Sequence, residues 1–146
     1  MSHAQTATDS VLAEVFDVAL GAAHAGATVL ASMRGQADIT AQADTKSAAG
    51  DWVTQADRAS EQAIREYIHA RRHDDALTGE EYDATGDTHA EYRWCIDPLD
   101  GTANFVRGLP HYGVSVAVAR REYLREDLDE DGNPTEDLSL IHISDG

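Results

Sequence analysis

Basic residues and cysteine are scarce in this chain of 146 residues. It has 11 lysines and arginines against 27 aspartates and glutamates, which gives a formal net charge of −16. Nucleic acids and anionic membrane surfaces attract basic proteins, so this balance argues against both as partners. Cys95 is the single cysteine, which excludes an internal disulfide and predicts a buried, inert thiol.

Lysine is the scarcest charged residue, with Lys46 as its single example. An acidic, lysine-poor surface suits a cytoplasm rich in salt, because counter-ions screen the self-repulsion of the protein. The coding bias of a GC-rich genome explains the same composition equally well. The first ten residues lack the basic and apolar regions of a signal peptide, and we expect no run that approaches a membrane span. These features predict a soluble, cytoplasmic protein.

The length allows at most one ordinary domain. Its first predicted element is a long amphipathic helix that Asp9 or Ser10 would cap and that ends at Gly35. Apolar and small residues recur along it at three- and four-residue steps: Leu12, Val15, Phe16, Ala19, Ala22, Ala23, Gly26, Val29, Leu30 and Met33. An interior glycine costs about 1 kcal/mol relative to alanine, so Gly26 predicts close packing of a neighbouring element. Residues 36–50 are polar and aperiodic, which predicts a loop or an irregular hairpin.

A second helix is predicted after the sequence DWVTQAD, residues 51–57. Thr54 and Asp57 have the spacing of a capping box, so Asp57 could simply satisfy the first amides of this helix. Residues 76–78 predict a short strand that leads into the sequence GEE, residues 79–81. On composition alone, adjacent glutamates indicate a solvated acidic surface.

The sequence WCIDPLDGTANFVRGLP, residues 94–110, places two acids at one turn. A buried strand predicted over residues 92–96 stops at Asp97, because Pro98 has no N–H to continue a ladder. The turn then leads to Asp100. Carboxylates are hard oxygen ligands that suit Mg²⁺, although aspartate, proline and glycine are also the commonest residues of ordinary surface turns.

A short helix is predicted directly after this turn, from Gly101 and Thr102 through Phe105. Backbone N–H groups at a helix start attract anions, so a phosphate site would coincide with the metal site. Further on, residues 113–119 alternate valine with serine and alanine, which predicts a strand with both faces covered. Residues 120–137 are strongly charged and predict a solvated hairpin or tail.

The pattern W-x-x-D-P-x-D-G-T-x-N-F-x-x-G-x-P in residues 94–110 closely resembles the signature of the inositol monophosphatase family of Mg²⁺-dependent, lithium-sensitive phosphatases. The DWVTQAD and GEE sequences resemble two further elements of that family. The resemblance implies an α+β fold, the layered αβαβα sandwich, present here as an N-terminal fragment with two long helices and part of a mostly antiparallel sheet. Residues 1–126 would belong to this domain, and residues 127–146 would form a charged tail, disordered or non-native.

The resemblance also implies a chemistry, the hydrolysis of a phosphate monoester of a small polyol or sugar by metal-activated water. Two or three Mg²⁺ ions, or Mn²⁺, would be held by Glu80, Asp97, Asp100 and the carbonyl of Leu99. The implied catalytic residues are Asp57 and Thr102, which would orient the water, together with Glu80. The implied phosphate contacts are the amides of Gly101 and Thr102, and Lys46 would reach the site from a loop. The full-length form would be a homodimer, and inositol phosphate, histidinol phosphate and fructose bisphosphate all stay open as substrates.

The family's C-terminal half, with a W-D-x-A-A-G motif and a third metal-binding aspartate, has no counterpart in this sequence. We therefore expect a fragment whose incomplete sheet leaves an apolar face uncovered at Val114, Val116 and Val118. Such a chain is expected to aggregate or to be partly molten. The alternative from another class is a noncatalytic remnant that binds a metal or a partner chain.

Overall fold

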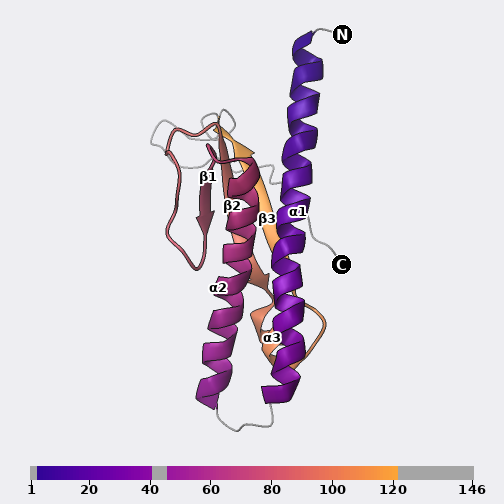
Figure 1. Ribbon diagram of the computed structural model, residues 1–146, viewed down its shortest axis with the longest axis vertical. Coiled ribbons are helices and arrows are strands. Elements are labelled where there is room, and N and C mark those ends of the chain that lie inside the picture. Colours follow the sequence, from indigo (N-terminus) through magenta and orange to yellow (C-terminus); the bar gives the residue numbers. More distant parts are fainter. Residues whose placement is uncertain (1–2, 41–45, 122–146) are drawn as a thin grey trace, which may run out of the picture.

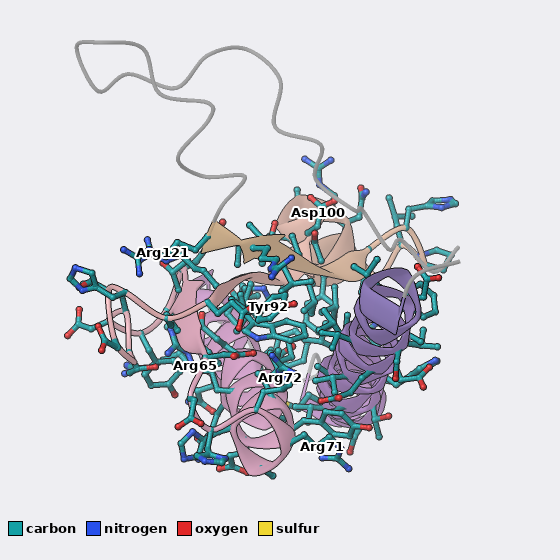
Figure 2. The ribbon with its side chains drawn as sticks, turned by 90° about the horizontal axis from the view of Figure 1, so that it is seen from above. Arg65, Arg71, Arg72, Tyr92, Asp100 and Arg121 are labelled. Carbon is teal, nitrogen blue, oxygen red and sulfur yellow. The ribbon has the colours of Figure 1, made fainter. Side chains whose placement is uncertain are left out.

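The computed structural model describes residues 3–40 and 46–121, and the side chains of residues 9–34, 50 and 52–121. The elements are, in chain order, α1 (His3–Thr40), α2 (Lys46–Arg71), β1 (Ala76–Gly79), β2 (Tyr92–Asp100), α3 (Thr102–Arg107) and β3 (Gly113–Arg120). The long helices α1 and α2 lie side by side on one face of the sheet (Figures 1 and 2). All four shorter elements begin where the sequence predicts them, although β2 continues beyond its predicted end.

The three strands form a mixed sheet in the order β1-β2-β3. β1 runs parallel to β2, with Leu77 opposite Trp94, and β2 runs antiparallel to β3, with Ile96 opposite Val116. Leu77 also exchanges two backbone hydrogen bonds of 2.9 Å with Thr85, so the loop after β1 folds back along its outer edge. The central strand β2 therefore carries the sequence motif between two partners.

The core lies between the helices and the sheet. The side chains of Trp94, Ile96 and Val116 are at most 4% exposed and pack against both helices. The main cluster consists of Val15, Val18, Ala19, Ala22, Ile64, Ile68, Leu77, Tyr92, Trp94, Ile96 and Val116. Val114 and Val118 pack against this cluster too, so the expectation that the valine face of β3 is uncovered is wrong. Helix α1 covers it.

The opposite face of the sheet carries Arg93 and Cys95, both exposed. The prediction of a buried Cys95 is therefore wrong, whereas its partner on β3, Ala117, is buried on the same face. Strand residues alternate between faces, and Trp94 and Ile96 occupy the face toward the helices. Partial desolvation still raises the pKa of the Cys95 thiol, which keeps it protonated and unreactive.

Both helices extend beyond their predicted ends. Helix α1 begins at His3 and continues through Gly35 to Thr40, and α2 already begins at Lys46. Most of the loop expected over residues 36–50 is therefore helical, because that stretch holds no proline and Gly35 does not adopt a left-handed conformation. The capping-box interpretation is also wrong. Thr54 lies inside α2, where its hydroxyl donates a hydrogen bond of 3.1 Å to the carbonyl of Gly50.

The stretch Asp9–Arg34 of α1 is long and apolar enough to cross a membrane by length and composition alone, with a mean hydropathy of 1.4. The expectation that no run approaches a span is wrong by this criterion. A core helix passes the same test, and this one buries Val15, Ala22 and Leu30 within the two hydrophobic clusters. The buried part of its apolar stripe thus serves the packing of α1 on α2 and β3, while Leu12 and Phe16 of the same stripe are exposed.

Gly26 lies where α1 packs tightly against α2, which confirms the predicted close packing. A Cβ atom at this position would lie 2.7 Å from Cδ1 of Ile64 and 2.9 Å from Oγ of Ser60. We expect Gly26→Ala to lower the free energy of unfolding by about 1–3 kcal/mol, because overpacking outweighs the better helix propensity. Urea denaturation monitored by circular dichroism measures this change.

Gly50 in α2 provides the matched control for that substitution. A Cβ atom at Gly50 would meet nothing within 4 Å. Gly50→Ala should therefore stabilise the protein by about 0.5–1 kcal/mol through helix propensity alone. Equal effects of the two substitutions would contradict the packing explanation for Gly26.

Candidate active site

The turn that carries the two aspartates is a bulge at the end of β2. The strand does not stop at Asp97, as predicted, but continues to Asp100. Asp97 pairs with Ser115 and Asp100 pairs with Gly113, so β2 has one residue more than β3 in this interval. Pro98 lies in the bulge, where no ladder hydrogen bond is required of it. The carboxylate of Asp97 accepts a hydrogen bond of 3.2 Å from the amide of Leu99 and fixes the turn.

Gly101 connects the bulge to α3 in a left-handed conformation, with φ 79° and ψ 36°. A Cβ atom here would lie 2.8 Å from the carbonyl oxygen of His111, so only glycine fits. The carbonyl of Gly101 then accepts the first helical hydrogen bonds, from the amides of Asn104 and Phe105. The predicted order of strand, tight turn and helix start is confirmed.

Thr102 begins α3, and its hydroxyl donates a hydrogen bond of 3.1 Å to the carbonyl oxygen of Leu99. The hydroxyl of Thr102, which is expected to orient the water together with Asp57, thus forms a hydrogen bond within the turn. A carbonyl oxygen has two lone pairs, so Leu99 retains one for a cation. The turn thus brings two of the predicted site residues into direct contact.

A cluster of three aromatic rings packs next to this turn. Phe105 is fully buried and stacks on Trp52 of α2, with ring centroids 5.0 Å apart and an interplanar angle of 6°. Tyr112 packs edge-on against the same ring at 4.8 Å. Arg34 of α1 donates a hydrogen bond to the carbonyl of Phe105, and its guanidinium carbon lies 5.6 Å from the ring centroid. The sequence pattern alone does not indicate this role for Trp52 or Arg34.

The predicted acidic residues gather at one end of the sheet from three elements. Asp57 lies in the middle of α2, Glu80 directly follows β1, and Asp97 and Asp100 lie at the end of β2. Burial, followed by the negative charges of Glu81, Glu80, Asp97 and Glu61, raises the pKa of Asp57 from 3.8 to about 6. Carboxylates that raise one another's pKa in this way favour a bound cation.

Glu80 and Asp97 are affected in the same direction. Burial and then the charge of Asp97 raise the pKa of Glu80, to which Glu81, Glu61 and Asp100 also contribute. For Asp97, burial and the charge of Asp100 raise the pKa, while the amide of Leu99 lowers it. Four of the predicted residues therefore share one electrostatic environment.

The donor set fits Mg²⁺ chemically, since every candidate ligand is a carboxylate or carbonyl oxygen. In the part of the chain that the structure describes, no group of three or more acidic, histidine or cysteine side chains is close enough to hold a metal ion. Glu80 and Asp100 are exposed, so their side chains can rotate toward a cation. The side chain of Lys46, the predicted loop contact, lies outside the described residues.

The sequence pattern did not indicate two further functional candidates, Ser60 and Glu61 of α2. Both are fully buried. Ser60 Oγ donates a hydrogen bond of 2.8 Å to the carbonyl of Pro98, inside the bulge. Their positions three and four residues after Asp57 place all three on one helix face, which is the signal that could have indicated them.

Comparison with known proteins gives a consistent result. A model of the inositol monophosphatase family matches residues 11–124. Phosphatase IMPL1, chloroplastic, of Arabidopsis thaliana is 49% identical over 71 residues, 49% of this chain and 19% of that protein. The fructose-1,6-bisphosphatase/inositol-1-monophosphatase of Aquifex aeolicus is 38% identical over 111 residues, 76% of this chain and 41% of that protein.

Among solved structures, the inositol monophosphatase from Anabaena (Nostoc) has a TM-score of 0.59 at 31% identity, and the match covers 75% of this chain and 36% of that one. The chain thus spans less than half the length of each of these relatives. The shared helices and mixed sheet confirm the expected fold class. The chain belongs to the inositol monophosphatase family.

Proposed function

We propose that this chain carries the acidic half of an active site that hydrolyses the phosphate monoester of a small polyol or sugar with the help of Mg²⁺. The observation that supports this proposal is the gathering of Asp57, Glu80, Asp97 and Asp100 from three elements at one end of the sheet. Mutual repulsion among these carboxylates lowers the stability of the fold. Binding of divalent cations by a phosphatase gives a physical reason for retaining such a cluster.

In this proposal each residue has one role. Glu80, Asp97, Asp100 and the carbonyl of Leu99 would hold the cation. Bound Mg²⁺ would neutralise phosphoryl oxygens and lower the pKa of a coordinated water. Asp57 would accept the proton of the attacking water as a general base, since it lies beside the proposed ligands without being one of them. Thr102 would orient that water, and the amides of Gly101 and Thr102 would bind the phosphate.

The substrate proposed first is an inositol phosphate. The Aquifex relative is named for both fructose-1,6-bisphosphatase and inositol-1-monophosphatase, which keeps a sugar bisphosphate as an alternative. Histidinol phosphate is a third candidate of the same chemical class. Phosphate release from each ester, compared at equal concentration, ranks the three.

A second candidate function is that of a noncatalytic chain that binds a metal or a partner. The observation that favours it is that no three candidate ligand side chains lie close enough to hold a metal ion in the part of the chain that the structure describes. Mg²⁺-dependent phosphate release by the purified chain would support the phosphatase. Mg²⁺ binding without phosphate release would support the noncatalytic function.

Removal of one proposed ligand tests the metal site directly. Loss of a residue that only orients a metal ligand typically weakens metal binding by about 10–100-fold. Asp97 is a proposed ligand itself, so we expect Asp97→Asn to weaken Mg²⁺ binding by at least this factor. Isothermal titration calorimetry of the 146-residue chain measures this affinity. Asp74→Asn is the matched control, because Asp74 is exposed just before β1, at the end opposite to Glu80. Equal affinities of the Asp97→Asn and unchanged chains would contradict the proposed site.

A further inference from the structure

Two consecutive residues of α2 form hydrogen bonds with the two segments that carry the proposed metal ligands, one residue with each segment. Ser60 donates to the carbonyl of Pro98, between Asp97 and Leu99. Glu61 Oε2 accepts a hydrogen bond of 2.7 Å from the backbone amide of Glu81. One turn of α2 therefore contacts the bulge of β2 and the loop after β1 at the same time.

The carboxylate of Glu61 occupies space that only a glycine leaves open. It lies against Gly79, where an added Cβ atom would be 2.2 Å from Oε1 of Glu61. Gly79 has no left-handed backbone conformation, so the close approach of Glu61 is the reason that a side chain does not fit. Glu61 thus contacts the residue before Glu80 and bonds to the residue after it.

Arg65 compensates the buried charge and extends the same contact. Its Nε donates a hydrogen bond of 2.7 Å to Oε1 of Glu61. Its other nitrogens donate to the carbonyl of Tyr82 at 3.1 Å and to the hydroxyl of Thr85 at 3.3 Å. Arg65 projects from α2 on the side of the loop between β1 and β2 (Figure 2). We call Glu61 and Arg65 the loop clamp.

The clamp leaves the loop little freedom. Tyr82 is also held through its ring, which lies 5.8 Å from the guanidinium carbon of Arg65 and 5.2 Å from that of Arg58. A buried carboxylate is stable only when it is paired and its oxygens accept hydrogen bonds, and Glu61 meets both conditions. The loop clamp is therefore a buried, fully hydrogen-bonded interaction and not a chance surface contact.

We propose that Glu61, held by Arg65, is a positioning residue that fixes the backbone on either side of Glu80 and so sets this ligand against Asp97. Ser60 does the same for the bulge. The inference rests on the proposed function, since Glu80 and Asp97 act there as ligands. Outer partners that orient metal ligands typically contribute about 10–100-fold to metal affinity.

Two variants of the full 146-residue chain test the clamp. Glu61→Gln leaves one acceptor oxygen in place of two, so either Arg65 or the Glu81 amide loses its partner. Gly79→Ala displaces the Glu61 carboxylate without any change of charge. In both we expect the Glu81 amide of the metal-free protein to exchange with solvent at least about tenfold faster, and Mn²⁺ to bind about 10–100-fold more weakly. NMR hydrogen exchange and Mn²⁺ titration supply the two readouts.

Glu81→Gln is the control for charge. It removes a carboxylate that also acts on Asp57, but it retains the backbone amide that Glu61 holds. The Glu81 amide should stay protected in this variant, and Mn²⁺ affinity should fall less than in Gly79→Ala. Unchanged exchange and affinity in both clamp variants would overturn the inference, and so would equal losses in all three. If the unchanged chain binds no Mn²⁺, the proposed function fails instead, and amide exchange alone decides whether Glu61 holds the loop.

Discussion

Replacing Phe105 with alanine should lower the free energy of unfolding by about 3–5 kcal/mol, as truncation of a buried phenylalanine typically does. The ring is fully buried in a cluster with Leu30, Ala56 and Leu99. It also stacks on Trp52, a contact that adds to the area it buries. Urea denaturation followed by tryptophan fluorescence measures the loss.

The adjacent residue is a suitable control. Val106 is 49% exposed on the other side of α3, and Val106→Ala should change stability by no more than about 0.5 kcal/mol. If Phe105→Ala unfolds the chain altogether, Phe105→Leu should give a measurable intermediate loss, because it retains part of the buried volume. Equal stability of the Phe105→Ala and Val106→Ala variants would show that the cluster does not support the turn.

The part of the site that sequence predicts well is the part built by local chemistry. Pro98 restricts the backbone and Gly101 permits the left-handed turn, so the order of strand, turn and helix follows from neighbouring residues alone. The predicted end of β2 lies too early in the sequence, because a bulge accommodates Pro98 within the strand. Bulges depend on the partner strand, here the pairing of Asp100 with Gly113, and the sequence of one strand does not contain it.

Helix lengths and side-chain environments were less predictable because they depend on tertiary contacts. Gly35 is compatible with a helix end, but α1 continues through it. Because α2 begins at Lys46, the predicted capping position at Asp57 lies in the middle of the helix. Glu61 and Arg65 have the spacing of an ordinary surface ion pair. The burial of Glu61 follows from its close approach to Gly79, which the sequence does not reveal. The residues proposed to align the site were therefore the hardest to identify.

Asp57→Asn should lower kcat for inositol phosphate hydrolysis by about 10²–10⁴-fold, the usual contribution of a general base. Asp57 is not among the proposed ligands, so the affinity for Mg²⁺ should change far less than in Asp97→Asn. The kcat value from phosphate-release assays and the affinity from calorimetry separate these two effects.

The same substitution should stabilise the metal-free protein. Burial and neighbouring carboxylates raise the pKa of Asp57 from 3.8 to about 6, so the folded state holds this proton more tightly than the unfolded state does. That stabilisation is complete below pH 3.8 and is lost as the pH rises to about 6, above which ionised Asp57 destabilises the fold. Asparagine avoids this loss. Because Asp57 is partly solvated, we expect a gain of about 1 kcal/mol at pH 7 and almost none at pH 3.5.

Thermal unfolding of both chains in the presence of a chelator, at pH 7 and at pH 3.5, measures this gain. If Asp57 serves catalysis at the expense of stability, its substitution should lower the activity and raise the stability. Asp74→Asn should alter neither, because Asp74 is exposed and remote from the site. If Asp57→Asn lowers activity and stability together at pH 7, Asp57 supports the packing of α2 and does not act as the base.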